Sequence, residues 1–340
     1  MKIIYIMPSA YTCGGNRITI EHCNGLAERG HEVGIICLDK KYSFDWIKIN
    51  PAINIIWQSE IRGEKKNYFK NTNIVVCTYY ETFYDMIGFK DLYPNAKLYY
   101  FIQQLEDRFF PDEGGKKRVK RTYEMSKQYN VGIITEAKWL VKELERLYGF
   151  KPIYIPNCQI LPEEIPKTEI KTNKVKVLVE GNAEAPGKGI QDAWEAIKDL
   201  DCYKILLTNS QEHLVPLKFD FDEMFCNVPW DRALSVIKAS DILVKPSYFE
   251  GSPTPIMEAW ELGTAVVTTN CTGWDEYGIK DINCKLVNIG DVEGIRNAVK
   301  ELINNKQERE ILIANGKRIA NNEFNGWKKS IDLLENTFKK

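Results

Sequence analysis

The sequence predicts an α/β protein built from two doubly wound parallel-sheet domains, each Rossmann-like. Its 340 residues exceed what a single hydrophobic core usually accommodates. Short apolar segments rich in β-branched residues alternate with longer amphipathic segments, a pattern typical of parallel strands covered by helices. Two such series are separated by residues 156–173, which have no apolar periodicity and the composition of a linker.

Seven apolar segments of the first series are expected to form one sheet: residues 2–7, 32–38, 53–58, 73–78, 97–102, 131–135 and 152–156. Six more are expected to form the second: residues 175–181, 203–209, 224–228, 241–247, 264–269 and 284–289. The chain from Ile289 onward is expected to be helical. These segments place the first domain at residues 1–160 and the second at residues 161–325.

The composition excludes several classes of protein. Hydrophobic residues make up 44% and charged residues 27%, as in ordinary globular proteins, and the formal net charge of -1 predicts no nucleic-acid partner. The nine cysteines include no C-x-x-C pair and no histidine at ligand spacing, so we expect reduced thiols and no metal site. The N-terminal apolar run is too short for a signal peptide or a membrane span, which predicts a cytoplasmic protein.

The first strand is followed by Gly14 and Gly15, ahead of an amphipathic helix expected over residues 18–29. Ligands of open α/β sheets bind beyond the carboxyl ends of the strands. Paired glycines there let the backbone approach a phosphate, and a helix N-terminus favours negative charge. A simple turn is the commoner explanation of such a pair.

The loop 181–189 follows the first strand of the second domain and holds Lys188 between Gly187 and Gly189. A lysine at the start of a helix is well placed to neutralise a diphosphate. A solvated lysine in a flexible turn is an equal alternative.

The most informative segment is residues 247–263. Pro255 is expected in the first turn of a helix that Gly263 ends, so Glu250 lies in a loop and Glu258 about one turn into the helix. Their carboxylates can accept hydrogen bonds from sugar and ribose hydroxyls while the helix N-terminus receives phosphate. Standing alone, the pair would be better explained as two solvated glutamates.

The motifs, taken in order along the chain, resemble family 4 of the retaining glycosyltransferases, which have the two-domain GT-B fold. The resemblance covers essentially the whole chain and is most specific in the C-terminal half. The matching segments are Gly14-Gly15, Arg29–Val33, Ile155–Asn157, Lys188-Gly189, Pro246-Ser247, Glu250-x7-Glu258 and Gly263–Val267.

The resemblance implies two domains facing an interdomain cleft and a metal-independent transfer that needs no cofactor and no protein base. Glu250 and Lys188 would be the catalytic residues, Glu250 on the transferred sugar and Lys188 on the diphosphate, with Glu258 on the ribose. The whole set implied to bind the donor is Gly14, Gly15, Asn182, Lys188, Val228, Pro229, Glu250, Gly251, Ser252, Pro253, Thr254 and Glu258.

The loop after the strand 97–102 resembles the corresponding loop of bacterial surface-polysaccharide transferases, including rhamnosyltransferases. Gln103 and Glu106 match its Gln-Asp-x-Glu pattern, while Gln104 replaces the acid. Polar groups beside aromatic rings suit a sugar. We therefore expect Arg17, Gln103 and Glu106 to bind a saccharide or lipid-linked glycan acceptor, with a plain surface loop as the alternative.

Two departures from the family keep other functions open. Asn182 stands where the family often has an arginine. The negative charge of the phosphates is then less well compensated unless Arg17 or Lys245 reaches them. The only histidines are His22, His31 and His213, so a catalytic histidine is not expected. A catalytically silent nucleotide-sugar-binding subunit and a nucleotide-sugar epimerase of the same fold are the alternatives to the transferase.

Two further expectations concern the periphery of the molecule. The basic run Lys116–Arg121 is either a solvated helix face or a contact with anionic membrane lipid, which would make the protein peripheral on the inner face of the membrane. The helix at residues 326–340 is implied by the resemblance to pack back on the first domain.

Overall fold

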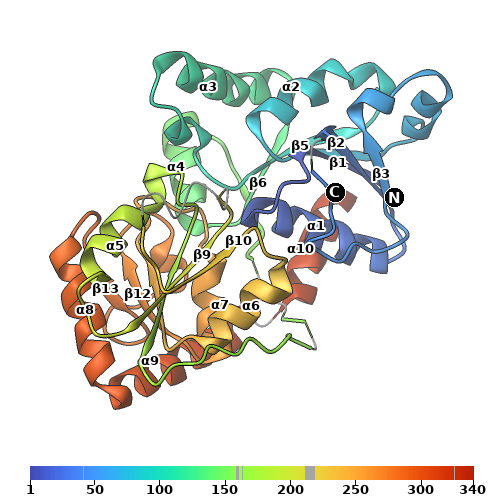
Figure 1. Ribbon diagram of the computed structural model, residues 1–340. Helices are drawn as coiled ribbons and strands as arrows, with labels where there is room; N and C mark the ends of the chain where they lie inside the picture. Colours follow the sequence, from blue (N-terminus) through green and yellow to red (C-terminus); the bar gives the residue numbers. More distant parts are fainter. Residues whose placement is uncertain (41, 158–160, 163, 211–218, 325) are drawn as a thin grey trace. The chain divides into compact units, whose positions relative to one another are not determined.

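The computed structural model describes residues 1–340 except 41, 158–160, 163, 211–218 and 325. It divides into two compact units, one formed by Met1–Asn157 with Lys328–Lys340 and the other by Cys158–Trp327. Each unit contains one parallel sheet and the helices that cover it (Figure 1). Cys158, one of the nine cysteines, and His213, one of the three histidines, lie outside the described part.

The sheet of the first unit has seven strands in the order β3-β2-β1-β4-β5-β6-β7, all parallel. Every strand expected from the sequence is present, with shifts of a few residues at the ends. The strands are β1 Lys2–Ser9, β2 Glu32–Asp39, β3 Asn54–Trp57, β4 Ile74–Cys77, β5 Lys97–Ile102, β6 Gly132–Thr135 and β7 Ile153–Tyr154.

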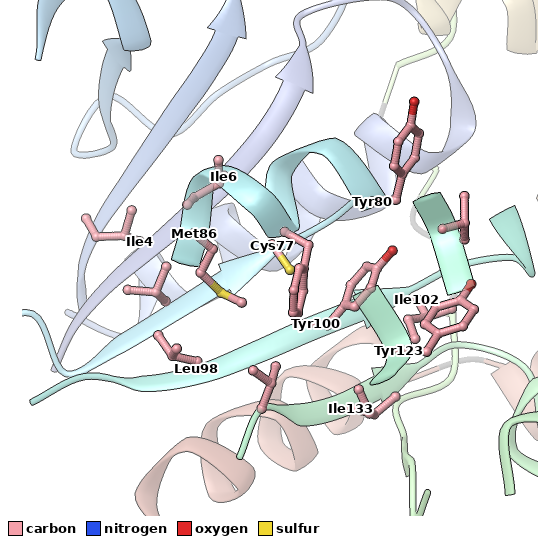
Figure 2. Packing of buried hydrophobic residues seen from close by; sticks show 14 of the residues in the cluster. Ile4, Ile6, Cys77, Tyr80, Met86, Leu98, Tyr100, Ile102, Tyr123 and Ile133 are labelled. Carbon is pink, nitrogen blue, oxygen red and sulfur yellow. The ribbon is translucent and has the colours of Figure 1, made fainter. Parts of the chain in front are cut away.

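One face of this sheet is the centre of the first core (Figure 2). Alternate residues of a strand share a face, and the register Ile4↔Val75 and Cys77↔Tyr100 places those faces side by side. Met86 of α2 and Tyr123 of α3 pack on the same cluster. The helices of this unit are α1 Gly14–Glu28, α2 Tyr80–Gly88, α3 Glu113–Gln128, α4 Lys138–Tyr148 and α10 Trp327–Lys339, with short 3-10 turns at Gln58–Glu60, Gly63–Phe69, Lys90–Leu92 and Glu106–Phe109.

The C-terminal helix α10 lies against the first unit. The rings of Tyr99 on β5 and Phe338 are 5.1 Å apart between centroids, and the Ser330 hydroxyl donates to the carbonyl of Pro156 at 2.7 Å. At Gly25 on α1, an added Cβ would lie 2.6 Å from Cγ1 of Ile331. The absence of a side chain at Gly25 therefore allows α1 and α10 to approach closely.

The sheet of the second unit has six parallel strands in the order β10-β9-β8-β11-β12-β13. Its strands are β8 Lys176–Glu180, β9 Tyr203–Thr208, β10 Glu223–Cys226, β11 Ile242–Lys245, β12 Ala265–Thr269 and β13 Lys285–Val287, as the sequence predicts. Its helical segments are a 3-10 turn at Pro186–Lys188, α5 Ile190–Ile197, α6 Trp230–Ala239, α7 Thr254–Leu262, a 3-10 turn at Trp274–Glu276, α8 Val292–Asn304, α9 Lys306–Ile319 and a π-helical turn at Ala320–Phe324.

The strand order of the second sheet reverses between β8 and β11. From β8 the chain proceeds outward to β9 and β10, then returns to β11 and continues to β12 and β13. Ligands of doubly wound sheets bind beyond the carboxyl ends of the strands at such a reversal. The loops 181–189 and 246–253, which carry Lys188 and Glu250, follow these two strands.

One helix boundary corrects the sequence analysis. We expected α1 to begin at Ile18, with Gly14 and Gly15 in the loop before it, but both glycines form its first turn, where the Arg17 amide donates to the Cys13 carbonyl at 3.0 Å. Glycine is a poor helix former, but burial of the helix outweighs this preference. The glycine amides are therefore those of a helix N-terminus, and not those of an open loop.

In the described part of the chain, no helix is long and apolar enough to cross a membrane. The eight described cysteines form no disulfide with one another.

Candidate functional site

The carboxylate of Glu250 is the centre of a cluster of charges in the second unit. Its Oε1 atom accepts hydrogen bonds from Nζ of Lys188 at 2.8 Å and from the hydroxyl of Ser247 at 2.6 Å, and Nζ of Lys245 is 3.0 Å away. The Glu250 side chain is 11% exposed and that of Lys188 31%. Among the described residues, no donor is found for Oε2. One carboxylate oxygen is thus held by the protein and the other is left for a ligand.

The surroundings of Glu250 keep it charged. Burial raises its pKa, but Lys188, Lys245 and the hydrogen bond from Ser247 outweigh burial and hold the pKa well below the usual range of a glutamate. The carboxylate is therefore ionised throughout the neutral range.

Lys245 is the last residue of β11 and is only 4% exposed. Its Nζ lies 2.7 Å from Oε2 of Glu180, the last residue of β8, and β8 pairs with β11 through Val179↔Val244. Burial lowers the pKa of Lys245, but the two carboxylates outweigh it and raise the pKa above the usual value. A buried ammonium needs such partners, because removing a charge from water is costly.

The cluster thus joins two lysines and two glutamates, and sequence reasoning identified it only in part. Glu180 was missed, and Lys245 was considered only as a substitute for the absent arginine. The available signal was a charged residue at the end of each of two otherwise apolar strands, KVLVE and ILVK.

The two loops of the site pack closely on each other. The Tyr248 amide donates to the carbonyl of Gly187 at 2.8 Å. A Cβ at Gly187 would lie 2.6 Å from the Phe249 ring, and one at Gly189, whose φ is +64°, would lie 2.1 Å from the carbonyl oxygen of Pro246. The glycines beside Lys188 are therefore required by packing, and the turn is closely packed where the alternative expected a flexible one, although Lys188 itself is 31% exposed.

Helix α7 has the boundaries that the sequence predicts, starting after Pro253 and ending at Gly263, whose φ is +89°. Glu258 is 5% exposed, and its Oε1 accepts a hydrogen bond from the Trp230 indole at 3.2 Å. The alternative of a solvated Glu258 is therefore wrong. Ser252, just before the helix, hydrogen-bonds the hydroxyl of Tyr277.

Asn182 belongs to a polar turn in the loop after β8. Its Oδ1 accepts from the Ser210 hydroxyl at 2.9 Å and from the Glu184 amide at 2.8 Å. Asn227, in the left-handed region at φ +51°, donates its side-chain amide to the Ser210 carbonyl at 2.7 Å, next to Val228 and Pro229. Among the described residues, the cations in contact with Glu250 are Lys188 and Lys245. Asn182, at the position where an arginine was considered, adds no positive charge.

In the first unit, Gln103 and Gly15 are in contact. Nε2 of Gln103 donates to the carbonyl of Gly15 at 3.3 Å. Asn16 donates to the carbonyls of Ser9 and Tyr11 at 3.0 and 2.8 Å, which joins the end of β1 to the start of α1. Arg17, on the same turn, is only 4% exposed.

Glu106 is not placed as we predicted. It is 2% exposed, and its Oε2 accepts from the Tyr80 amide at 2.7 Å and from the Tyr100 hydroxyl at 3.0 Å. Burial raises its pKa to about 8, against the effect of these hydrogen bonds. Its carboxylate therefore joins the loop after β5 to the N-terminus of α2, and we withdraw the expected contact with an acceptor.

Of the two described histidines, one is buried and the other has a hydrogen-bond partner at each ring nitrogen. His22 is 1% exposed, and burial lowers its pKa to about 3. The ring of His31 lies between the terminal amine of Met1, at 3.1 Å, and Oε1 of Glu335, at 3.0 Å.

The basic run Lys116–Arg121 lies on α3. Lys117, Arg118, Lys120 and Arg121 are exposed, whereas Lys116 pairs with Glu113 at 2.9 Å. Phe109, just before the helix, is 47% exposed. A positive and partly aromatic surface therefore exists on the first unit.

No group of three or more histidine, cysteine, aspartate or glutamate residues in the described ranges is arranged to hold a metal ion.

Comparison with known proteins supports a glycosyltransferase fold. Residues 223–319 match the family model described as glycosyl transferases group 1. An uncharacterized glycosyltransferase of Methanocaldococcus jannaschii is 32% identical over 114 residues, which cover 33% of this chain and 29% of that protein. The chain is therefore matched to less than a third of the length of this relative.

Two solved structures show the same fold over nearly their whole length. Sucrose-phosphate synthase from Thermosynechococcus elongatus has a TM-score of 0.81 at 16% identity, covering 100% of this chain and 98% of that one. The Anabaena protein HepE, solved in complex with UDP and glucose, has a TM-score of 0.76 at 12% identity, covering 100% and 99%. The chain thus has the GT-B fold, with two Rossmann-like parallel-sheet domains.

Proposed function

We propose that this protein is a retaining glycosyltransferase that moves a sugar from a nucleotide diphosphate donor onto a saccharide or lipid-linked glycan acceptor, without a metal. The observation that carries the proposal is the charge cluster at the reversal of the second sheet. It combines a partly exposed lysine with a carboxylate that has one oxygen left for a ligand. The segment that matches the family model includes Glu250 and Glu258.

Each donor group has a partner of suitable chemistry in this proposal. Lys188 stabilises the negative charge that develops on the leaving diphosphate, aided by the amides at the N-terminus of α7. Oε2 of Glu250 accepts a hydrogen bond from a hydroxyl of the transferred sugar, and Glu258 accepts from the ribose. Val228 and Pro229 border the base.

The configuration at the anomeric carbon of the sugar is retained if the acceptor hydroxyl attacks from the side on which the diphosphate leaves. A leaving phosphate oxygen then takes the proton, and no side chain needs to act as a base. The protein positions the reactants and supplies fixed charges. The two described histidines, one buried with a lowered pKa and one paired with a glutamate, suit this scheme better than epimerisation, which requires acid and base groups at the sugar.

On the acceptor side, we assign Gln103 and Arg17 of the first unit to the saccharide. The exposed basic residues of α3 and Phe109 would contact anionic lipid headgroups when the acceptor is lipid-linked. A role in the synthesis of a surface polysaccharide accords with both assignments.

The proposal is tested first by binding. Because a ligand that binds the native state raises the melting temperature, one of UDP, GDP, dTDP and ADP should stabilise the purified protein. Lys188→Ala should weaken that binding about tenfold or more, since it removes a charge-assisted contact. Exposed Lys198 on the same unit provides the control, and Lys198→Ala should bind as the parent does.

Turnover separates the transferase from a silent binding subunit. Incubation with the matching nucleotide sugars should release nucleoside diphosphate, and Glu250→Gln should lower that rate by about one to three powers of ten. If the parent binds nucleotide but never releases it from a sugar in the presence of candidate acceptors, the silent-subunit alternative is correct.

A further inference from the structure

Lys188, the cation that we assign to the diphosphate, already has a partner in the structure. Its Nζ lies 2.8 Å from Oε1 of Glu250. An ammonium has three N–H donors, so the contact of Lys188 with Glu250 weakens when a phosphate oxygen takes one of those donors, and it is lost when that oxygen lies beyond the reach of the present position of Nζ. The donor then competes with Glu250 for Lys188.

Glu250 remains held when Lys188 leaves. The same Oε1 atom has Lys245 at 3.0 Å and the Ser247 hydroxyl at 2.6 Å, both from β11 or the residues that follow it. Lys245 is itself fixed by Glu180 at 2.7 Å and is almost fully buried, whereas Lys188 is 31% exposed. Lys245 is thus enclosed and fixed, whereas the partly exposed side chain of Lys188 has room to move.

The backbone beneath Lys188 is fixed, so a change of partner involves the side chain alone. The Lys188 amide donates to the Ala185 carbonyl at 2.9 Å, and Gly189 packs directly on the Pro246 carbonyl. A flexible four-carbon stem carries the ammonium. Rotation about that stem is a small motion compared with movement of the loop.

We propose that Lys188 exchanges partners, leaving Glu250 for the diphosphate when the donor binds, and that Lys245 is the positioning residue that keeps Glu250 in place and ionised during the exchange. The inference rests on the proposed function and extends it. Without the donor, the cluster of Lys188, Lys245, Glu180 and Glu250 is neutral. After the exchange, Glu180, Lys245 and Glu250 together carry one net negative charge.

The exchange would leave this net negative charge beside the sugar when the bond between the sugar and the diphosphate breaks. The sugar carbon gains positive character as the diphosphate departs, and a nearby carboxylate stabilises it more strongly when one neighbouring cation, and not two, offsets the charge of that carboxylate. Donor binding would thus strengthen the electrostatic stabilisation of the sugar carbon by Glu250, because Lys188 moves away from that carboxylate.

The sharpest test is the binding of a nucleoside diphosphate without a sugar, because such a probe cannot contact Glu250 through sugar hydroxyls. Isothermal titration calorimetry with UDP, GDP, dTDP and ADP identifies the tightest of the four, which is then used throughout. Glu250→Gln removes the competitor for Lys188 and should tighten binding about three- to tenfold, although it slows transfer. Circular dichroism confirms that the variant is folded.

The outcomes distinguish this inference from the proposed function. If the parent binds one of the probes, Lys188→Ala weakens binding, and Glu250→Gln leaves it unchanged or weakens it, the exchange is wrong and the donor site stands. If the parent binds none of the probes, both the donor site and the exchange fail.

Lys245 is tested by a double-mutant cycle. Lys245→Met alone would leave the Glu180 carboxylate without its cation, so Lys245→Met is combined with Glu180→Gln to keep the protein folded. Without Lys245, Lys188 is the remaining cation at Glu250 and is held there more strongly. The double substitution should therefore weaken nucleotide binding several-fold when Lys188 is present and have little effect when Lys188 is replaced by alanine. Lys245→Arg should restore most of the affinity. Equal effects in both backgrounds would show that Lys245 acts only through stability, and the positioning role would be rejected.

Discussion

At the scale of single residues, two buried glutamates show how neighbours decide the ionisation of a carboxyl group. Glu250 lies beside two lysines, and its pKa is lowered despite burial. Glu106 has only neutral hydrogen-bond donors, and burial raises its pKa to about 8. Burial alone would raise both, so the difference arises from the cations.

The raised pKa of Glu106 predicts how stability varies with pH. The folded state binds the proton more tightly than the unfolded state, in which the carboxyl has the ordinary glutamate pKa of 4.5. The associated stability is therefore fully present below pH 4.5 and is lost as pH rises through about 8. The parent should lose on the order of 3 kcal/mol between pH 5 and pH 8 from this group.

Glu106→Gln should remove most of that loss, because glutamine can accept the same hydrogen bonds without becoming charged. Its melting temperature should match the parent near pH 5 and exceed it at pH 8. Exposed Glu124 on α3 provides the matched control, and Glu124→Gln should leave the profile of the parent unchanged. Parallel profiles for Glu106→Gln and the parent would contradict the assignment.

At the scale of elements, α1 packs against α10, and this joint holds the C-terminal segment of the first unit to its N-terminal segment. Gly25 accommodates Ile331, while Arg29 lies 2.6 Å from Asp332 and 2.9 Å from Glu335. The pKa of Glu335 is lowered to about 2, mainly by its hydrogen bond with Lys339 and also by those with Arg29 and His31. Exposed ion pairs contribute little, so close packing at Gly25 should dominate this joint.

Gly25→Ala tests that packing. By helix propensity alone, alanine should stabilise α1 by about 1 kcal/mol. The added Cβ would instead meet Cγ1 of Ile331 at 2.6 Å, and we expect a lower melting temperature with a cost of about 1 to 3 kcal/mol. Gly14→Ala, at a position with no atom near the added Cβ, should show no such loss.

A second substitution shows whether the contact is the cause. Ile331→Ala makes room for the new methyl group, so it should cost less in the Gly25→Ala background than in the parent. If Gly25→Ala is as stable as the parent, the joint is not closely packed at this point.

At the scale of the whole molecule, the residues proposed for the donor come mainly from the second unit, and those proposed for the acceptor from the first. The C-terminal helix belongs to the first unit although the second precedes it in sequence. The proposed chemistry relies on lysine and helix amides for charge compensation, where other enzymes use a metal ion.

This reliance predicts that transfer survives excess EDTA. The described residues offer no cluster of metal ligands, and Lys188 would perform the task of the metal at the diphosphate. Initial rates measured with and without chelator should agree within error. A loss of activity that magnesium or manganese restores would contradict the metal-independent mechanism.

The sequence by itself determined the strands, their number in each sheet and helix α7. These features depend on local properties: runs of β-branched residues suit buried strands, and proline and glycine start and end a helix. The assignment of Lys188, Glu250 and Glu258 to one candidate donor site was implied by the family resemblance and stays a prediction, with which the contact between Lys188 and Glu250 accords.

Only the tertiary structure decided which charged groups meet and which are enclosed. Glu180 and Lys245 are far apart in the chain and come together through the register of β8 and β11. Glu106 has the sequence context of an exposed loop but is buried by Tyr80 and Tyr100, which belong to other segments. Gly14 and Gly15 become helical because the whole of α1 packs on its sheet. Burial, register and pKa depend on contacts between distant residues, and local sequence patterns do not contain that information.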